Sequence, residues 1–255
     1  MQEWLFHVWT NLTLKLLFTL TVKHPREYTV LSNTLVSSED TDMRGNTTTT
    51  FITTPKMSTY LVSVIISKFV VALTGNEDQY EFKIFTRQSV RNLTNKVVGP
   101  YYSKIIAKLN DFTGVTYENI SNIQCYQVAI NDYYPYSMGE FGLFMYRESD
   151  ILDEGDKTSP RDTQNILMTM AYKLSHQWFG GDISTKWWSD VWANEAVSTY
   201  LKYFIPHQIN NEFDLAYQFV VEVIQNALQL DALPVIRPFL QTNLMSRLPE
   251  IFNTN

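Results

Sequence analysis

Cysteine is almost missing from this sequence, since the 255 residues include only Cys125. An intrachain disulfide needs two cysteines and a cysteine-rich zinc site needs several, so both are excluded. Basic residues are also too few for a nucleic-acid-binding surface: 20 Lys and Arg stand against 26 Asp and Glu, which gives a net charge of -6. We therefore expect no nucleic-acid partner.

Long apolar runs are missing as well. The longest covers residues 60–73, is interrupted by Ser63, Ser67 and Lys68, and is shorter than the ~20 residues that a membrane-spanning helix needs. We predict a buried strand there and no membrane span. The first residues lack the basic and apolar regions of a signal peptide, so no export signal is expected in the chain.

Hydrophobic and aromatic residues, by contrast, are abundant. They make up 45% and 14% of the chain. Charged residues make up 18%, below the ~25% of an average globular protein. This composition excludes a disordered chain and predicts broad apolar faces or aromatic-lined clefts. With ~150 residues as a typical domain length, we expect one large domain or two modest ones.

Strand-like patterns fill the first third of the sequence. Between Leu12 and Val22 the even positions are apolar and most odd positions are polar, which predicts one long strand with a buried face. The acidic stretch from Ser37 to Gly45 is predicted to be a polar loop. Further strands are predicted over residues 28–31, 47–54 and 81–86. We therefore expect an all-β module over residues 1–87.

Helical spacing dominates after residue 87. Ser159 and Pro160 form a helix start, with serine as the N-cap and proline at the first helical position, and Ser189 is expected to cap the next helix. Other helices are predicted over 101–110, ended by Gly114, and over 212–230, with strands over 123–130 and 143–146. The fold class expected from the whole pattern is α+β.

One stretch of the sequence carries recognisable chemistry. It runs from Tyr172 to Gly180 as Tyr-Lys-Leu-Ser-His-Gln-Trp-Phe-Gly, and Glu195 follows His176 by nineteen positions. The pattern resembles the core of aminopeptidase N-like zinc metallopeptidases, the gluzincins, whose motif is H-E-x-x-H, eighteen residues and E. Side chains four positions apart lie on one face of a helix, so two histidines at that spacing can bind one Zn²⁺ together with a glutamate from a second helix.

The resemblance implies two incomplete domains. Residues 1–87 would be the C-terminal part of the family's N-terminal β domain, and residues 88–255 the N-terminal part of a truncated, thermolysin-like peptidase domain. The family's transition-state tyrosine would then lie beyond Asn255. The resemblance also suggests a cell-surface or extracellular location and peptides as partners, whereas the oligomeric state stays open.

The sequence departs from the motif at the positions that perform the chemistry. Tyr172 stands where the family has its first histidine ligand, and Lys173 stands where it has the general-base glutamate. His176 and Glu195 keep the other two ligand positions. The resemblance thus implies a Zn²⁺ cofactor, but with one of three ligands lost we expect low occupancy.

A second family motif, which recognises the free α-amine of the substrate, is altered too. It aligns with residues 136–142, and its amine-binding glutamate falls on Gly139. Glu140 lies one residue further along and is the candidate substitute. In an extended segment that offset turns the side chain to the opposite face, so we do not expect Glu140 to replace the glutamate fully.

The charge of Lys173 leads to a further hypothesis. At ~5 Å from a dication, with an effective dielectric of ~20, a lysine ammonium is repelled by roughly 6 to 7 kcal/mol. We therefore expect the Lys173 ammonium to take over the charge of the metal and to pair with Glu195 or Glu148. The three tryptophans of residues 187–192 are expected to pack in the core between helices.

Two functions follow from these patterns. The leading hypothesis is a pseudoenzyme, an aminopeptidase homologue without catalytic activity that can bind peptides. The alternative is a zinc metalloaminopeptidase that removes N-terminal residues from peptides with weak residual activity. The zinc content of the chain discriminates between the two.

Overall fold

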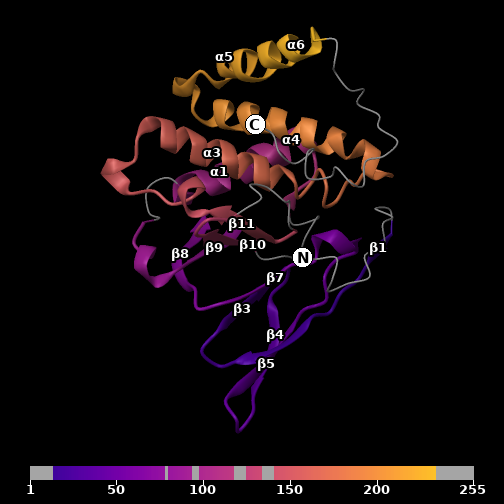
Figure 1. Ribbon diagram of the computed structural model, residues 1–255, viewed down its shortest axis with the longest axis vertical. Coiled ribbons are helices and arrows are strands. Elements are labelled where there is room, and N and C mark those ends of the chain that lie inside the picture. Colours follow the sequence, from indigo (N-terminus) through magenta and orange to yellow (C-terminus); the bar gives the residue numbers. More distant parts are fainter. Residues whose placement is uncertain (1–13, 78–79, 94–97, 118–124, 134–140, 234–255) are drawn as a thin grey trace.

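The structure, a computed structural model, describes residues 14–77, 80–93, 98–117, 125–133 and 141–233. Strands make up the N-terminal end of an elongated molecule and helices the C-terminal end (Figure 1). The expected α+β class, with β structure preceding a helix-rich part, is confirmed.

Eleven strands occur in the described residues. They form a three-stranded antiparallel sheet in the order β2-β5-β4, the pairs β1–β6 and β3–β7, and a four-stranded sheet in the order β11-β10-β9-β8. The strands are β1 (Lys15–Leu16), β2 (Thr21–Pro25), β3 (Thr29–Ser32), β4 (Val36–Thr41), β5 (Asn46–Phe51), β6 (Met57–Ser58), β7 (Val64–Ser67), β8 (Val70–Glu77), β9 (Tyr80–Thr86), β10 (Cys125–Ile130) and β11 (Leu143–Arg147).

Three predictions for the N-terminal strands were wrong. The stretch expected to be one strand up to Val22 is divided into β1 and β2, because the backbone around Phe18 and Leu20 hydrogen-bonds to residues 51 and 54 outside a regular ladder. The predicted polar loop at 37–45 contains β4, an edge strand whose six residues are all exposed and therefore show no alternation. The apolar run at 60–73 is a 3-10 turn (Thr59–Leu61) followed by β7 and part of β8, and not one buried strand.

The four-stranded sheet joins strands from both sides of residue 87. β10 pairs in parallel with both β9 and β11, whereas β8 and β9 form an antiparallel hairpin. The division of the chain at residue 87 stays a prediction, and the pairing of β9 with β10 ties the two segments together.

The helices are α1 (Val98–Thr113), α3 (Pro160–Ser175), α4 (Val191–Ile209), α5 (Leu215–Phe219) and α6 (Asn226–Asp231), with a π-helical segment (Val220–Gln225) between the last two. The Ser159 hydroxyl accepts a hydrogen bond from the Asp162 amide at the start of α3, which confirms that cap. The Ser189 cap was wrong, because a 3-10 turn (Trp188–Asp190) precedes α4 and Asp190 occupies the cap position. No helix in the described ranges is both long and apolar enough to span a membrane.

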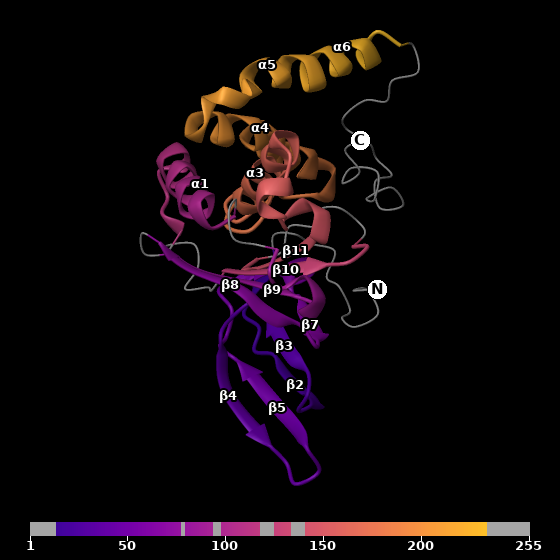
Figure 2. The same ribbon diagram turned by 90° about the vertical axis from the view of Figure 1, so that its left-hand side faces the viewer.

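The helices stack above the four-stranded sheet, with α4 over α3 and α5 and α6 outermost, while the β4–β5 hairpin projects from the opposite end (Figure 2). One large apolar cluster connects these layers. It contains Met57 and Leu61 from the N-terminal region, Phe82 and Phe144 from the sheet, and residues of α1, α3 and α4. The N-terminal segment and the helical layer therefore share one core.

Gly75 provides a test of the packing between the sheet and α1. It lies opposite Phe82 in the β8–β9 hairpin, and a Cβ added to it would come within 2.1 Å of the Phe82 ring. That ring is fully buried against Tyr102, with ring centroids 4.2 Å apart, so it cannot move aside freely. We predict that Gly75→Ala lowers the free energy of unfolding in urea by about 1–3 kcal/mol.

The matched control is Gly99→Ala in the first turn of α1. A Cβ there meets only Leu73, at 3.9 Å, which is an ordinary contact. This variant should be neutral or slightly stabilising because alanine is the better helix former. Equal unfolding free energies for the two variants would contradict the described packing of Phe82.

Candidate functional site

Two helices bring the retained ligand positions together. α3 ends at Ser175, and His176 follows directly as its C-cap residue, still with helical backbone angles. α4 packs against α3 and carries Glu195 in its second turn. Both side chains are buried, with 7% of His176 and 8% of Glu195 exposed. The geometry expected for ligands on two helices is therefore present at these two positions.

Tyr172, predicted to stand at the position of the first ligand, makes a hydrogen bond of its own. Its hydroxyl donates to Glu195 Oε2 in a short, buried contact. The Tyr172 ring stands edge-on to the His176 ring, with centroids 4.7 Å apart. His176 Nε2 lies 3.8 Å from the same Glu195 oxygen, which is too far for a hydrogen bond. Tyr172, His176 and Glu195 thus form one buried cluster, with the phenol bound directly to the carboxylate.

The orientation of the His176 ring is fixed by the hydrogen bond of its Nδ1 atom. Nδ1 lies 3.1 Å from the carbonyl oxygen of Phe179, and because a carbonyl only accepts hydrogen bonds, Nδ1 carries the proton. Nε2 is then an acceptor in the neutral ring. Among the described residues Nε2 has no hydrogen-bond partner, although it is fully buried.

These residues do not fit a zinc ion. A zinc site needs three or four donors with available lone pairs, and here only the imidazole and the carboxylate qualify, because the phenol uses its proton to bind the carboxylate. The described part of the chain contains no group of three or more His, Cys, Asp or Glu that could hold a metal ion. The side chains of this cluster therefore do not supply the ligand set that the resemblance implies.

Lys173, the next residue of α3, is also buried, with 2% of its surface exposed. Its ammonium donates to the carbonyl oxygen of Met145 in β11 and lies 4.9 Å from the centroid of the Tyr146 ring. The predicted pairing of Lys173 with Glu195 or Glu148 is not found among the ion pairs of the described residues, and Glu195 accepts from Tyr172 instead. Glu148 forms its ion pair elsewhere.

The partner of Glu148 is Arg87, which follows β9. The guanidinium binds the carboxylate through two contacts of 2.7 and 2.9 Å, and this bidentate pair raises the pKa of Arg87. An arginine fork matches a carboxylate better than the single ammonium of Lys173 does. Spacing in the sequence gave no sign of this pairing.

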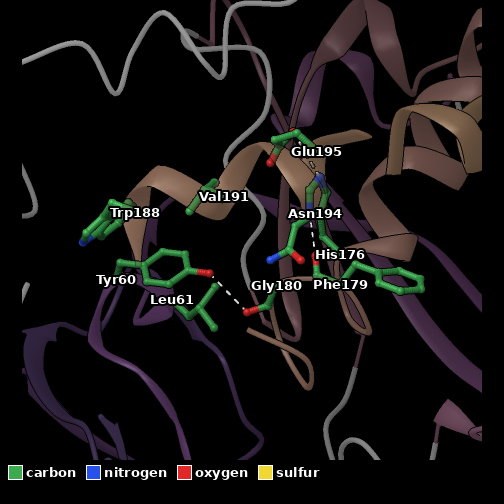
Figure 3. A pocket seen from close by; sticks show the side chains of 9 residues that line it. All are labelled: Tyr60, Leu61, His176, Phe179, Gly180, Trp188, Val191, Asn194 and Glu195. Atoms are coloured by element: carbon green, nitrogen blue, oxygen red, sulfur yellow. Dashed lines mark hydrogen bonds and ion pairs between the residues drawn. The ribbon is translucent and has the colours of Figure 1, made fainter. Parts of the chain in front are cut away.

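A small pocket opens beside the cluster. His176 and Glu195 line one side, and Tyr60 with Trp188 lines the other (Figure 3). The Tyr60 hydroxyl donates to the Gly180 carbonyl at 3.1 Å. Burial and the charge of Glu195 raise the pKa of Tyr60 above its usual range, so the phenol is neutral and can donate. Tyr60 comes from the N-terminal region and was not predicted as a site residue.

The tryptophans near this pocket are less buried than expected. Trp187 is 57% exposed and Trp192 is 40% exposed, so the prediction that all three pack in the core was wrong. Trp188 lines the pocket and contacts the Tyr60 ring, with centroids 5.5 Å apart.

Comparison with known proteins identifies the family. The family model described as "Peptidase family M1 domain" matches residues 101–255, more than half of the chain. The chain belongs to peptidase family M1. The model described as "Peptidase M1 N-terminal domain" matches residues 13–61.

Curated relatives of this M1 chain are aminopeptidases. They include aminopeptidase N of Oryctolagus cuniculus (29% identical over 251 residues), aminopeptidase N of Haemonchus contortus (28% over 223 residues) and membrane alanyl aminopeptidase of Manduca sexta (26% over 220 residues). These alignments cover 94%, 87% and 86% of this chain but only 25%, 22% and 22% of the relatives. The chain thus spans about a quarter of the length of these proteins. The matches confirm the expected aminopeptidase N-like family.

The M1 motif for amine recognition cannot be placed in space. Gly139 and Glu140 lie outside the described residues. The motif's last residues are described: the Gly142 amide donates to Gln177 at 3.1 Å, and the Phe141 carbonyl accepts from Asn33 at 2.7 Å. The end of the predicted motif is therefore bound both to the turn that follows α3 and to the N-terminal region.

Tyr172 gives a direct test of the buried cluster in the M1 chain. We predict that Tyr172→Phe lowers the free energy of unfolding by about 1–3 kcal/mol, because the buried Glu195 carboxylate loses its donor. Urea denaturation followed by circular dichroism provides the measurement. Tyr200→Phe on the exposed side of α4 is the matched control, with an expected change within about 0.5 kcal/mol. A Tyr172→Phe variant as stable as this control would refute the role of the hydroxyl.

Proposed function

We propose that this chain is a non-catalytic member of peptidase family M1 that binds ligands with its pocket and does not hydrolyse peptides. The observation that carries the proposal is the hydrogen bond from Tyr172 to Glu195. It occupies a carboxylate oxygen that a metal would need, and it does so with a side chain that replaces a metal ligand. Peptides are the ligand class proposed, because the relatives are named aminopeptidases.

The position of Lys173 supports the same proposal. In the resemblance this residue stands where the family has its general base, which accepts a proton from the attacking water. An ammonium that donates to the Met145 carbonyl has no lone pair to accept that proton. Because general-base catalysis typically contributes about 10²- to 10⁴-fold to the rate, its loss alone reduces turnover severely.

The alternative proposal is a zinc metalloaminopeptidase with weak residual activity. It is favoured by the burial of His176 and Glu195 side by side at two ligand positions, and by the names of the relatives. In that case His176 and Glu195 would hold the metal, and Tyr172 would have to give up its proton to become the third ligand. The ordinary pKa of a tyrosine, ~10, makes this unfavourable near neutral pH. A location at the cell surface is proposed only by analogy with the membrane alanyl aminopeptidase.

Zinc content after purification separates the two proposals. We predict that the wild-type chain, equilibrated with zinc and desalted, retains well below one zinc per chain by plasma emission spectroscopy, since two ligands hold the ion weakly. The double variant Tyr172→His/Lys173→Glu restores the H-E-x-x-H pattern next to Glu195 and should retain about one zinc per chain.

The control for an added surface histidine is Tyr200→His on α4, which should behave like the wild type. One tightly held zinc in the wild-type chain would overturn the non-catalytic proposal. A double variant that folds but gains no zinc would show that α3 and α4 no longer support the family's ligand geometry.

A further inference from the structure

The outermost helical layer, from α5 to α6, is apolar on two sides. On one side Leu215, Phe219 and Val223 pack against Met168 of α3 and Tyr203 of α4. A helix that is apolar all round is typically buried on every side. On its other side, however, five large apolar residues are between 40% and 75% exposed, and we call them the outer stripe: Tyr217, Val220, Val221, Ile224 and Leu228.

The outer stripe is one continuous surface. Its members follow one another at intervals of three, one, three and four residues, which places them on the same side of a helix. Three of the five belong to the π-helical segment Val220–Gln225, and such segments occur frequently at functional sites. In Figure 2 α5 and α6 form the outermost layer, with α4 beneath them, so no described element covers the outer stripe.

The area of the outer stripe suits a protein interface. At these exposures each copy presents roughly 500 Å² of apolar surface, so the pairing of two copies would bury roughly 1,000 Å². Exposed polar residues beside the stripe, such as Gln225 and Gln229, bring the total near the ~1,200 Å² at which stable interfaces begin. An apolar patch of this size on one chain marks an interaction site.

The charge of the helix selects the kind of partner. Residues 215–233 contain no Lys or Arg and only two acids, Glu222 and Asp231. Glu222 accepts a hydrogen bond from the Tyr203 hydroxyl of α4 at 2.9 Å. A helix that lies on a membrane is rich in basic residues on its polar face, and a charged peptide needs complementary charges. This helix offers neither, whereas an identical uncharged stripe meets no like charge.

The spacing of the outer stripe also matches itself when reversed. Tyr217 and Leu228 have the same midpoint in the sequence as Val221 and Ile224. Antiparallel pairing of two such helices therefore sets Tyr217 against Leu228 and Val221 against Ile224, each contact occurring twice. A two-fold interface requires this self-complementarity, and helix dipoles favour the antiparallel arrangement.

We propose that two copies of this chain pair through the outer stripe, with their helices antiparallel about a two-fold axis between Val221 and Ile224. The interface is separate from the buried cluster of Tyr172 and Glu195. The inference therefore goes beyond the proposed function, and it holds whether or not the chain binds zinc.

Sedimentation velocity of the 255-residue chain between about 1 and 100 µM tests this proposal. The wild type should shift from monomer to dimer within that range, because an interface of this size without charged contacts supports micromolar affinity. A chain that stays monomeric at the highest concentration, or that forms larger open assemblies, would overturn the proposal.

Val221→Glu places a charge at the centre of the interface. The side chain is exposed in the single chain, so the fold should tolerate the change, whereas dimerisation should weaken about 100-fold or more. Met43→Glu, at the fully exposed end of the β4–β5 hairpin, is the matched control and should dimerise like the wild type. Dimerisation that survives Val221→Glu unchanged would place the contact elsewhere and contradict the proposal.

A mixing experiment tests the two-fold arrangement. Val221→Lys alone should be monomeric like Val221→Glu, but an equimolar mixture of the two variants should dimerise, because position 221 of each copy lies about one helical turn from its equivalent. A mixture that stays monomeric would refute the antiparallel pairing.

Urea denaturation identifies the other possible cover of the outer stripe. Suppose that the wild type is monomeric and that Val221→Glu lowers its urea midpoint more than Met43→Glu does. Residues of the same chain outside the described ranges would then cover the stripe, and a second copy would not.

Discussion

The Glu195 carboxylate is buried between two helices, and the arrangement of the site follows from how its charge is compensated. A carboxylate taken out of water needs donors or cations close to it. In this chain the donor is the Tyr172 hydroxyl, which joins the last turn of α3 to the second turn of α4. The hydrogen bond compensates the buried acid and links the two helices.

The side chains at the two altered motif positions contact different elements. Tyr172 donates to Glu195 of α4, whereas Lys173 donates to a backbone carbonyl of β11 and lies near the Tyr146 ring. The ammonium therefore contributes to packing against the sheet and does not replace a metal. The N-terminal region completes the site from the other side, since the Tyr60 hydroxyl binds the Gly180 carbonyl. Both parts of the chain thus build the pocket.

Local sequence signals predicted the features that depend on local chemistry. The Ser159 cap, the end of α1 at Gly114 with its positive φ, and the proximity of His176 and Glu195 follow from caps, glycine and spacing. The features that depend on tertiary partners were missed. β4 has no buried face to reveal it, and the Arg87–Glu148 pair joins residues 61 positions apart. Because apolar residues signal burial only on average, the exposed Trp187 was missed too.

Anomalous X-ray diffraction at the zinc K edge tests the central claim most directly. Crystals of the wild-type chain grown with zinc would locate any bound ion relative to Tyr172, His176 and Glu195. The hydrogen-bonded cluster predicts no anomalous peak between His176 Nε2 and Glu195, with the Tyr172 hydroxyl still in contact with the carboxylate. A strong peak there, with Tyr172 displaced or acting as a ligand, would contradict it.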